Sequence, residues 1–414
     1  MTSTPFLSPG AASDAPFSFR SIAVSAYGPS LLFSIGDGAV LPVIALTARH
    51  LGASVAEASL IVAMIGIFSL VSNIPAAMAI ARFGERASLV GASTISFVSL
   101  LLCIFAPHYW LLAVGVAGIG VAAAVFSLAR QSYLLDAVPQ AVRARALSLL
   151  GGSARVGLFI GPFVGAGVIH LMGVTGAYCA ALVAVAAAGV LSYRAPDLTV
   201  RAAPGSSSSG GARDRPGVLT VLRSHWRVFL TLGLGVVMVS AMRASRLVVI
   251  PLWADHMNLA PAASSLIYGL GAAVDMLVFY PAGAVMDRHG RFWVALPSSV
   301  TMAIAFIGIA ASGHSVFWFV LASLLLGFGN GIGSGIVMTL GADAAPVQNR
   351  TAFLGFWRVL SDTGTCLGPV LLSAMTALMT LAAGVVSTGA LGLLGAAVFW
   401  RWLPRRVAAQ DAHG

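Results

Sequence analysis

Residues 281–291 read PAGAVMDRHGR, and residues 75–85 read PAAMAIARFGE. The proline, an arginine and the glycine of the two stretches coincide when the chain is shifted by 206 residues, about half of its length of 414. The same shift aligns residues 42–91 with residues 248–297. Because the period is half the chain, the sequence indicates one duplicated domain rather than a solenoid of short repeats. In a membrane protein, a parallel repeat of this kind places a binding site at the junction of the two halves.

The composition is typical of a membrane protein. Of all residues, 58% are hydrophobic and 9% are charged, and the mean hydropathy is +0.94. A water-soluble chain of this length would carry far more polar side chains. All 23 basic residues are arginines. Without lysine there is no Walker A lysine and no Schiff-base lysine, so the chain by itself is neither an ATP-driven pump nor a retinal protein.

The formal net charge of +10 does not indicate a nucleic-acid partner, because the arginines lie where a membrane protein needs them for orientation. The three cysteines lie in apolar stretches and lack the spacing of a zinc site: Cys103, Cys179 and Cys366. We therefore expect no metal site, no cofactor and no nucleic-acid partner.

Twelve apolar stretches are long enough to cross a bilayer, which takes about 20 residues. They cover residues 22–46, 57–81, 88–106, 110–132, 146–171, 174–193, 228–252, 262–286, 293–312, 315–340, 352–377 and 379–400. The polar, serine-rich and glycine-rich segment between the sixth and seventh stretches is typical of a flexible linker. The sequence therefore predicts an all-α membrane protein with two pseudo-symmetric six-helix bundles. Residues 1–195 form the N-terminal bundle, 196–227 a cytoplasmic linker, and 228–414 the C-terminal bundle with a short tail.

The arginines are divided unevenly between the two sets of predicted loops. If the N-terminus is cytoplasmic, the loop arginines fall on that side of the membrane, with Arg49 as the exception. Cytoplasmic loops of membrane proteins carry an excess of basic residues. We therefore expect a multi-pass protein of the cell inner membrane with both termini in the cytoplasm.

Residues 281–291 also contain a loop motif. Its residues Gly283, Asp287, Arg288, Gly290 and Arg291 resemble the signature between the second and third helices of each half in the major facilitator superfamily. The glycine allows a tight turn, and the aspartate can accept a hydrogen bond from an arginine or a helix N-terminus. Such contacts would hold the cytoplasmic side of the molecule in one conformation.

The first half departs from this motif, because Ala81 stands where the family usually has the aspartate. Either Glu85 replaces the aspartate, or Asp287 alone provides the contact.

A second loop motif follows the fourth span and consists of Asp136, Pro139 and Arg143. It is repeated in the second half as Asp343, Pro346 and Arg350. The resemblance implies a cytoplasmic gate formed by Arg82, Gly84, Glu85, Asp136, Arg143, Asp287, Arg288, Gly290 and Arg291.

The fifth span carries a glycine–proline motif, which consists of Gly157, Gly161, Pro162 and Gly165. It resembles the signature of the drug:proton antiporters of the same superfamily. Glycines four residues apart let helices approach closely, and proline removes a backbone donor and kinks the helix. Ordinary small-residue packing is the alternative interpretation. The fourth span lacks the arginine that many antiporters have, since Val114 stands at that position.

Eight ionisable residues lie inside predicted spans, where each costs at least about 2.5 kcal/mol at a helix centre and needs a partner or a wet cavity. They are Asp37, Arg130, Arg155, Arg243, Arg246, Asp275, Arg358 and Asp362. The resemblance implies that spans 1, 4, 7 and 10 line a central cavity, that spans 2, 5, 8 and 11 form the interface between the halves, and that the others face lipid. None of the eight residues lies on a lipid-facing span.

Asp37 aligns with Arg243 under the shift of 206 residues, and Arg246 lies one turn beyond Arg243 on the same helix face. We therefore expect a salt bridge between Asp37 and Arg243 across the cavity. It is either broken during transport or a permanent contact between the halves.

We expect different contacts for each of the other charged residues inside the spans. Arg358 and Asp362 lie four residues apart and should neutralise each other, and Arg155 should join them across the interface. Arg130 should reach the lipid headgroups or the loop after the second span. Asp275 has no charged neighbour in the sequence, so it should either carry a proton or be a neutral, hydrogen-bonded acid.

These patterns predict a secondary transporter that works by alternating access and couples the efflux of an apolar neutral or anionic molecule to protons. Asp37 and Asp275 would carry protons, and Arg243, Arg246 and Asn330 would contact the substrate. Proton-coupled uptake of an organic anion is the alternative. The expected partners are the small molecule, protons and the lipid bilayer, and the expected state is a monomer. A membrane receptor or enzyme on the same fold is an alternative of another class, although the chain lacks the common hydrolase and metalloprotease motifs.

Overall fold

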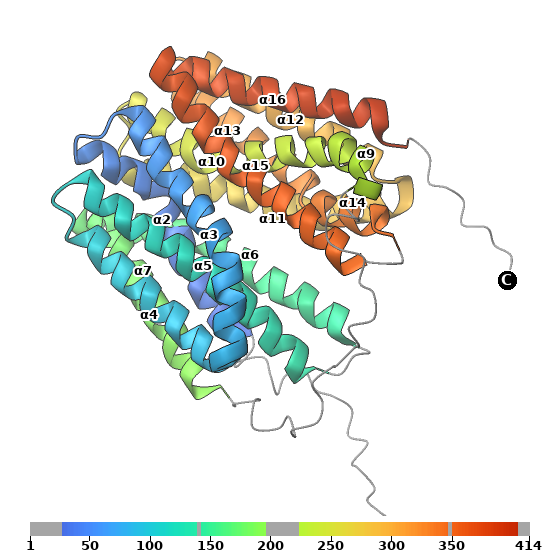
Figure 1. Ribbon diagram of the computed structural model, residues 1–414. Helices are drawn as coiled ribbons and strands as arrows, with labels where there is room; N and C mark the ends of the chain where they lie inside the picture. The colour runs from blue at the N-terminus through green and yellow to red at the C-terminus, as the bar shows by residue number, and fades with distance from the viewer. Residues whose placement is uncertain (1–26, 139–141, 196–222, 347–349, 405–414) are drawn as a thin grey trace, which may run out of the picture.

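The computed structural model describes residues 27–138, 142–195, 223–346 and 350–404, and these ranges are almost entirely helical. Figure 1 shows the helices of the first half, coloured blue to green, in one bundle and those of the second half, coloured yellow to red, in another. The first half contains α2 (Gly28–His50), α3 (Val55–Phe83), α4 (Glu85–Ile104), α5 (Tyr109–Ala137), α6 (Arg143–Met172) and α7 (Thr175–Arg194). The greater part of the predicted linker lies outside the described residues.

The second half repeats this order with two irregular spans. Its helices are α9 (Trp226–Val228), η4 (Phe229–Gly233), α10 (Leu234–His256), α11 (Pro261–His289), α12 (Phe292–Ala311), α13 (Val316–Ile332), α14 (Ile336–Ala344), α15 (Arg350–Leu378) and α16 (Leu381–Trp402). The short segments α9 and η4 run directly into α10. The tenth predicted span is broken between α13 and α14 by a turn at residues 333–335, which contains two glycines.

Within the described ranges, eleven helices are long and apolar enough to cross a membrane. In this set, Trp226–His256 and Val316–Ala344 each count as one span. The predicted eleventh span, α15, is 29 residues long but is not in the set. Polar residues lower its hydropathy, among them Arg358, Ser361, Asp362, Thr363 and Thr365. The chain is therefore an all-α, multi-pass membrane protein, and its described residues form twelve long helical spans when α13 and α14 are counted as one, as the sequence predicts.

The repeated loop glycines adopt the same conformation in both halves. Gly84 ends α3 with φ of 82°, and Gly290 ends α11 with φ of 95°. A residue with a Cβ rarely adopts such an angle, so glycine allows the tight turn at both places. The prediction of a turn at Gly290 is confirmed, and the repeat explains why Gly84 has the same geometry.

The glycine–proline motif of the fifth span packs α6 against α2. A Cβ on Gly161 would lie 2.5 Å from the backbone oxygen of Ile35 and 2.6 Å from the Cα of Gly38. The equivalent glycine of the second half, Gly368, meets the backbone of Ala241 on α10 in the same way. The motif therefore provides close contact within each bundle.

The two bundles meet near the end of the molecule where α2 and α10 end, which we call the Arg49 end. There Arg49 forms an ion pair of 3.2 Å with Asp255, and the Ser373 hydroxyl donates to the carbonyl of Ala56 at 2.7 Å. The opposite end, where α7 ends and α9 begins, is called the linker end. On the linker-side parts of α6 and α15, Gly151 and Gly355 face open space. The two polar contacts between the halves named here lie toward the Arg49 end.

Candidate functional site

A cavity of about 300 Å³ lies between the bundles and is lined by α6 from the first half and by α10, α11 and α13 from the second. The break after α13 also contributes Ser334. Five charged or polar residues singled out from the sequence line this cavity, which we call the central cavity: Arg155, Arg243, Arg246, Asp275 and Asn330. Residues far apart in the chain therefore converge on one polar site at the junction of the repeats.

Asp275 is the centre of the interactions in this cavity. The side-chain nitrogen of Asn330 donates a hydrogen bond of 2.6 Å to Oδ2 of Asp275. Arg246 Nη1 lies 3.7 Å from the same oxygen, and Arg155 Nη1 lies 3.9 Å from Oδ1. Asp275 therefore interacts with two guanidinium groups and an amide, although the sequence shows no charged neighbour within its helix.

The arginines of α10 have hydrogen-bond donors that no protein atom accepts. Nε and Nη2 of Arg243 are buried without a protein acceptor, and so are Nε and Nη1 of Arg246. The guanidinium group of Arg246 lies 5.4 Å from the ring centre of Tyr268, within the range of a cation–π contact. The turn after α13 makes room for Arg243, because a Cβ on Gly333 would lie 3.0 Å from Nη2 of Arg243.

Arg155 joins the two halves. It extends from α6 to Asp275 on α11, and it also donates a hydrogen bond to the hydroxyl of Ser334. Its guanidinium group lies 4.2 Å from the ring centre of Phe279. The prediction that Arg155 would join Arg358 and Asp362 is therefore wrong. The repeat placed Arg155 on an interface helix, but the facing residue is set by how α6 crosses α11.

A second cavity of about 280 Å³ lies beside the first, and Leu158 lines both. We call it the side cavity. Its polar lining includes Ser34, Asp37, Asn73, Arg130, Arg358 and Asp362. The Nε of Arg358 lies 3.8 Å from Oδ2 of Asp362, so this predicted pair is confirmed. The side-chain amide of Asn73 donates to the same oxygen at 3.4 Å, which links α3 to α15.

Asp37 and Arg243 do not form the predicted salt bridge. Asp37 lines the side cavity, where Arg130 supplies the attractive charge, whereas Arg243 lines the central cavity. Equivalent positions of the two helices meet at Arg49 and Asp255 instead. Asp37 lies about 18 Å back along α2 from that contact, at 1.5 Å per residue. The alignment of the two halves therefore predicted that Asp37 and Arg243 lie at similar depths in the membrane, but it did not predict which residues they contact.

The position of Arg130 also differs from the prediction. Nη1 of Arg130 donates to the hydroxyl of Ser30 at 2.6 Å, and Nε is buried without a protein acceptor. The side chain lines the side cavity rather than reaching the headgroups or the loop after α3. Since α5 packs with its arginine toward α2, the positive charge is turned inward beside Asp37.

At the linker end, the second half contains a well-formed ion pair. Nε of Arg291 lies 2.7 Å from Oδ2 of Asp343, and Nη2 lies 3.4 Å from Oδ1, a two-point contact between the loop and α14. Asp287 is exposed, and no ion pair is found for it in the described ranges. Asp287 lies before the turn at Gly290, whereas Arg291 follows the turn and points back toward Asp343. The expected contact of Asp287 is therefore not made in this conformation.

The first half has a different arrangement at the same place. Glu85 occupies the position of Arg291 in the repeat and accepts a hydrogen bond of 3.1 Å from Ser132. The Asp136 carboxyl group lies near that of Glu85 and faces Arg143. Glu85 therefore takes part in the loop contact but does not reproduce the aspartate–arginine pair.

The other predicted gate residues surround these contacts. Arg82, Gly84 and Glu85 line an open cavity of about 660 Å³ at the linker end. Arg82 lies 5.5 Å from the ring centre of Phe83, and Arg288 is exposed. Pro139 lies outside the described residues, as does the side chain of Arg350.

Sequence reasoning missed several residues of both cavities. Tyr268 and Phe279 contact guanidinium groups, Ser334 accepts from Arg155, and Asn73 contacts Asp362. A usable signal existed for Asn73 and Tyr268, because each is a polar side chain within an apolar predicted span. No comparable signal marked Ser334, since its role depends on the break between α13 and α14.

Twelve long helices in a repeated order, with polar cavities that open between the halves, define a multi-pass membrane transporter. The family model of the Major Facilitator Superfamily matches residues 30–279 and 232–413, so the chain belongs to the major facilitator superfamily. This is a family of transporters rather than of enzymes.

Curated relatives are distant. The multidrug resistance protein MdtH of Yersinia pestis (strain Pestoides F) is 23% identical over 294 residues, which is 69% of this chain and 69% of that protein. MdtH of Yersinia pseudotuberculosis serotype O:1b (strain IP 31758) matches equally.

Solved structures share the fold at low identity. A D-xylose–proton symporter has a TM-score of 0.72 at 16% identity, covering 93% of this chain and 98% of that chain. The nucleoside transporter NupG has a TM-score of 0.70 at 12% identity, covering 92% and 98%.

Proposed function

We propose that this transporter couples the export of a small neutral or anionic organic molecule to the movement of protons across the inner membrane. The observation that carries the proposal is the central cavity, where ionisable side chains from both halves converge. The similarity to proteins named as multidrug resistance proteins supports export.

The proposed cycle is alternating access about the central and side cavities. Contacts such as the Arg49–Asp255 pair hold the Arg49 end together, and Gly151 and Gly355 face open space on the linker-side parts of α6 and α15. The positive-inside rule places the linker end, with its arginine-rich loops, in the cytoplasm. The conformation described here is then open to the inside, and both termini are cytoplasmic. Rocking of the halves would break the contacts at the Arg49 end and form new ones at the linker end.

Within this cycle, Asp37 and Asp275 are the carboxyl groups that we propose to carry protons. Arg243, Arg246 and Asn330 would contact the substrate, and Arg155 would link the substrate region to the first half. The pair of Arg358 and Asp362, held by Asn73, would connect α15 to α3. Intramembrane ionisable residues that line a cavity are more often functional than structural.

A second candidate function is the import of an organic anion together with a proton. It is favoured by the contact of Asp275 with Arg155 and Arg246. A proton on Asp275 would free these guanidinium groups for an anion, so binding of the proton and of the anion would strengthen each other. That sign of coupling is the one expected when both move in the same direction.

Transport in proteoliposomes of known orientation tests the proposal. We expect proton flux that depends on an added compound, and we expect Asp37→Asn to abolish the coupled flux while the protein still folds. Glu57→Gln is a matched control, because Glu57 lies in the capping box of α3 at the Arg49 end and a glutamine side chain can still accept from the backbone N–H of Ser54. Full coupled flux in Asp37→Asn would remove Asp37 from the mechanism. Comparing the direction of flux in inside-out and right-side-out vesicles separates export from import.

A further inference from the structure

The central cavity contains more positive than negative charge. Three guanidinium groups line it, from Arg155, Arg243 and Arg246, and they face a single carboxylate, Asp275. The other polar groups of the lining are uncharged, namely Tyr268, Asn330 and Ser334. With Asp275 ionised, the formal charge of the lining is two positive units. Buried charge of this kind is costly unless a counter-charge balances it.

The side cavity does not supply that counter-charge. It contains Asp37 and Asp362 as well as Arg130 and Arg358, so its formal charges cancel. Within it, Arg358 forms an ion pair with Asp362. The two excess positive charges therefore belong to the central cavity alone.

The unused donors of the arginines point to the shape of the missing group. Nε and Nη2 of Arg243, and Nε and Nη1 of Arg246, are buried without a protein hydrogen-bond acceptor, although Nη1 of Arg246 lies 3.7 Å from Asp275. The Nε and Nη2 donors of Arg243 lie on one edge of its guanidinium group and match two oxygens of a carboxylate, a sulfonate or a phosphate. The cavity volume of about 300 Å³ is at the small end of ligand sites, and equals roughly ten water molecules in the liquid.

From these observations we propose that the central cavity binds a small organic dianion, with Arg243 and Arg246 as its main contacts and Asp275 as a competing internal anion. The proposal deepens the proposed proton-coupled transport and rests on it, because it names the charge class of the transported molecule. Competition at Asp275 gives the sign of coupling described above for the second candidate function, import of an organic anion together with a proton. The aromatic rings of Tyr268 and Phe159 line the same cavity and would contact the carbon skeleton.

Competition explains the role of Asp275. Its carboxylate interacts with Arg246 and Arg155 at 3.7 and 3.9 Å, longer than the hydrogen bond it accepts from Asn330. An anion that approaches these guanidinium groups more closely would displace a weak ion pair. Removing the charge of Asp275 should therefore strengthen anion binding.

Binding of simple probes to the purified full chain tests the site. The probes are 1,2-ethanedisulfonate, which is doubly charged at every pH used, ethanesulfonate, which is singly charged, and uncharged dimethyl sulfone. At constant ionic strength, thermal stabilisation and calorimetry should give binding of the disulfonate that is at least about tenfold tighter than that of the monosulfonate, and no binding of the sulfone. Equal binding of all three, or of none, would overturn the proposal.

Variants locate the binding within the cavity. Arg243→Gln and Arg246→Gln should each weaken disulfonate binding by about tenfold or more, as expected for a lost charged hydrogen bond. Arg227→Gln, which removes an exposed arginine beside Trp226, should leave it unchanged. Asp275→Asn should tighten binding several-fold. Weaker binding in Asp275→Asn would refute the competition.

The failure of this inference can be separated from the failure of the proposed function. If the disulfonate does not bind but neutral compounds still drive Asp37-dependent proton flux, the dianion site is wrong and proton-coupled transport stands. If the disulfonate binds but no compound drives proton flux, the site stands and the coupling is wrong.

Discussion

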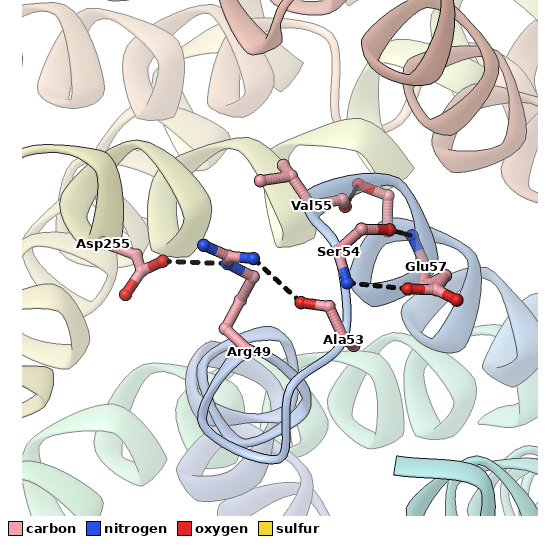
Figure 2. Close-up of polar contacts among 7 residues, drawn as sticks. Arg49, Ala53, Ser54, Val55, Glu57 and Asp255 are labelled. Carbon is pink, nitrogen blue, oxygen red and sulfur yellow. Dashed lines mark hydrogen bonds and ion pairs between the residues drawn. The ribbon is translucent and has the colours of Figure 1, made fainter.

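Arg49 and Asp255 are equivalent residues of the two halves, 206 positions apart, and their side chains form an ion pair of 3.2 Å between the bundles. Figure 2 shows Arg49 between Asp255 and the carbonyl oxygen of Ala53, to which it donates a second hydrogen bond of 2.8 Å. In a pseudo-two-fold structure, equivalent positions near the axis face each other. Two identical charges at these positions would repel each other. Because one half has arginine and the other has aspartate, the contact is attractive.

Breaking this pair should favour opening at the Arg49 end. The side chains are 34% and 30% exposed, so the pair contributes at most about 1 kcal/mol, or roughly a fivefold change in the balance of conformations. In Asp255→Asn, a cysteine at Ala272 in the central cavity should react faster with an impermeant maleimide added from the Arg49 side. The exchanged pair Arg49→Asp with Asp255→Arg should restore the slower reaction. Unchanged labelling in Asp255→Asn would show that the pair does not hold this end closed.

Close packing of α6 against α2 should make Gly161 intolerant of even one added methyl group. A Cβ there would lie 2.5 to 2.7 Å from backbone atoms of α2, which side chains cannot relieve by rotating. Gly161→Ala should therefore destabilise the protein by about 1–3 kcal/mol in thermal unfolding. Gly167→Ala on the same helix is the control, because its Cβ would have no atom within 4 Å. Equal unfolding temperatures for the two variants would contradict the packing.

The ion pair at the linker end should depend on Asp343 rather than Asp287. Asp343→Asn removes one charge of the two-point contact with Arg291 and should lower stability by about 1 kcal/mol or less. Asp287→Asn should have a smaller effect, because Asp287 is exposed and forms no ion pair within the described ranges. Thermal unfolding and limited proteolysis of the α11–α12 loop would measure both. The reverse order of effects would support a contact of Asp287 in the dominant conformation.

Replacing Glu85 by arginine should recreate the second-half contact in the first half. Asp136 now faces a carboxyl group, whereas its equivalent Asp343 faces Arg291. Glu85→Arg would place an opposite charge beside Asp136 and should raise stability by up to about 1 kcal/mol. Glu85→Gln, which removes the like charge without adding a positive one, is the matched control. A lower unfolding temperature for arginine than for glutamine would count against equivalence of the two loops.

Properties that depend on spacing within one helix could be predicted from the sequence. Arg358 and Asp362 pair because residues four apart share a helix face. The turn at Gly290 followed from the loop motif, and the repeat accounts for the same conformation at Gly84. Asn330 was expected to contact the substrate, and the charges inside spans, Asp275 among them, were expected to need a partner or a wet cavity.

Contacts between helices could not be predicted in this way. The expected partner of Asp37 was Arg243, and that of Arg155 was Asp362, yet the structure pairs Arg155 with Asp275 and places Asp37 beside Arg130. Each error assigned a correct depth in the membrane and a wrong neighbour. Depth follows from counting residues along a helix, whereas the neighbour depends on the rotation and crossing of two helices.

The amino-acid sequence by itself determined the duplication, the membrane class, the superfamily resemblance and the set of buried charges, because hydropathy and residue spacing are properties of the chain alone. The tertiary structure decided that these charges separate into a positive central cavity and a neutral side cavity, and that the halves meet through Arg49 and Asp255. That division depends on how two bundles pack against each other, and packing between distant segments is a collective property that no single stretch of sequence specifies.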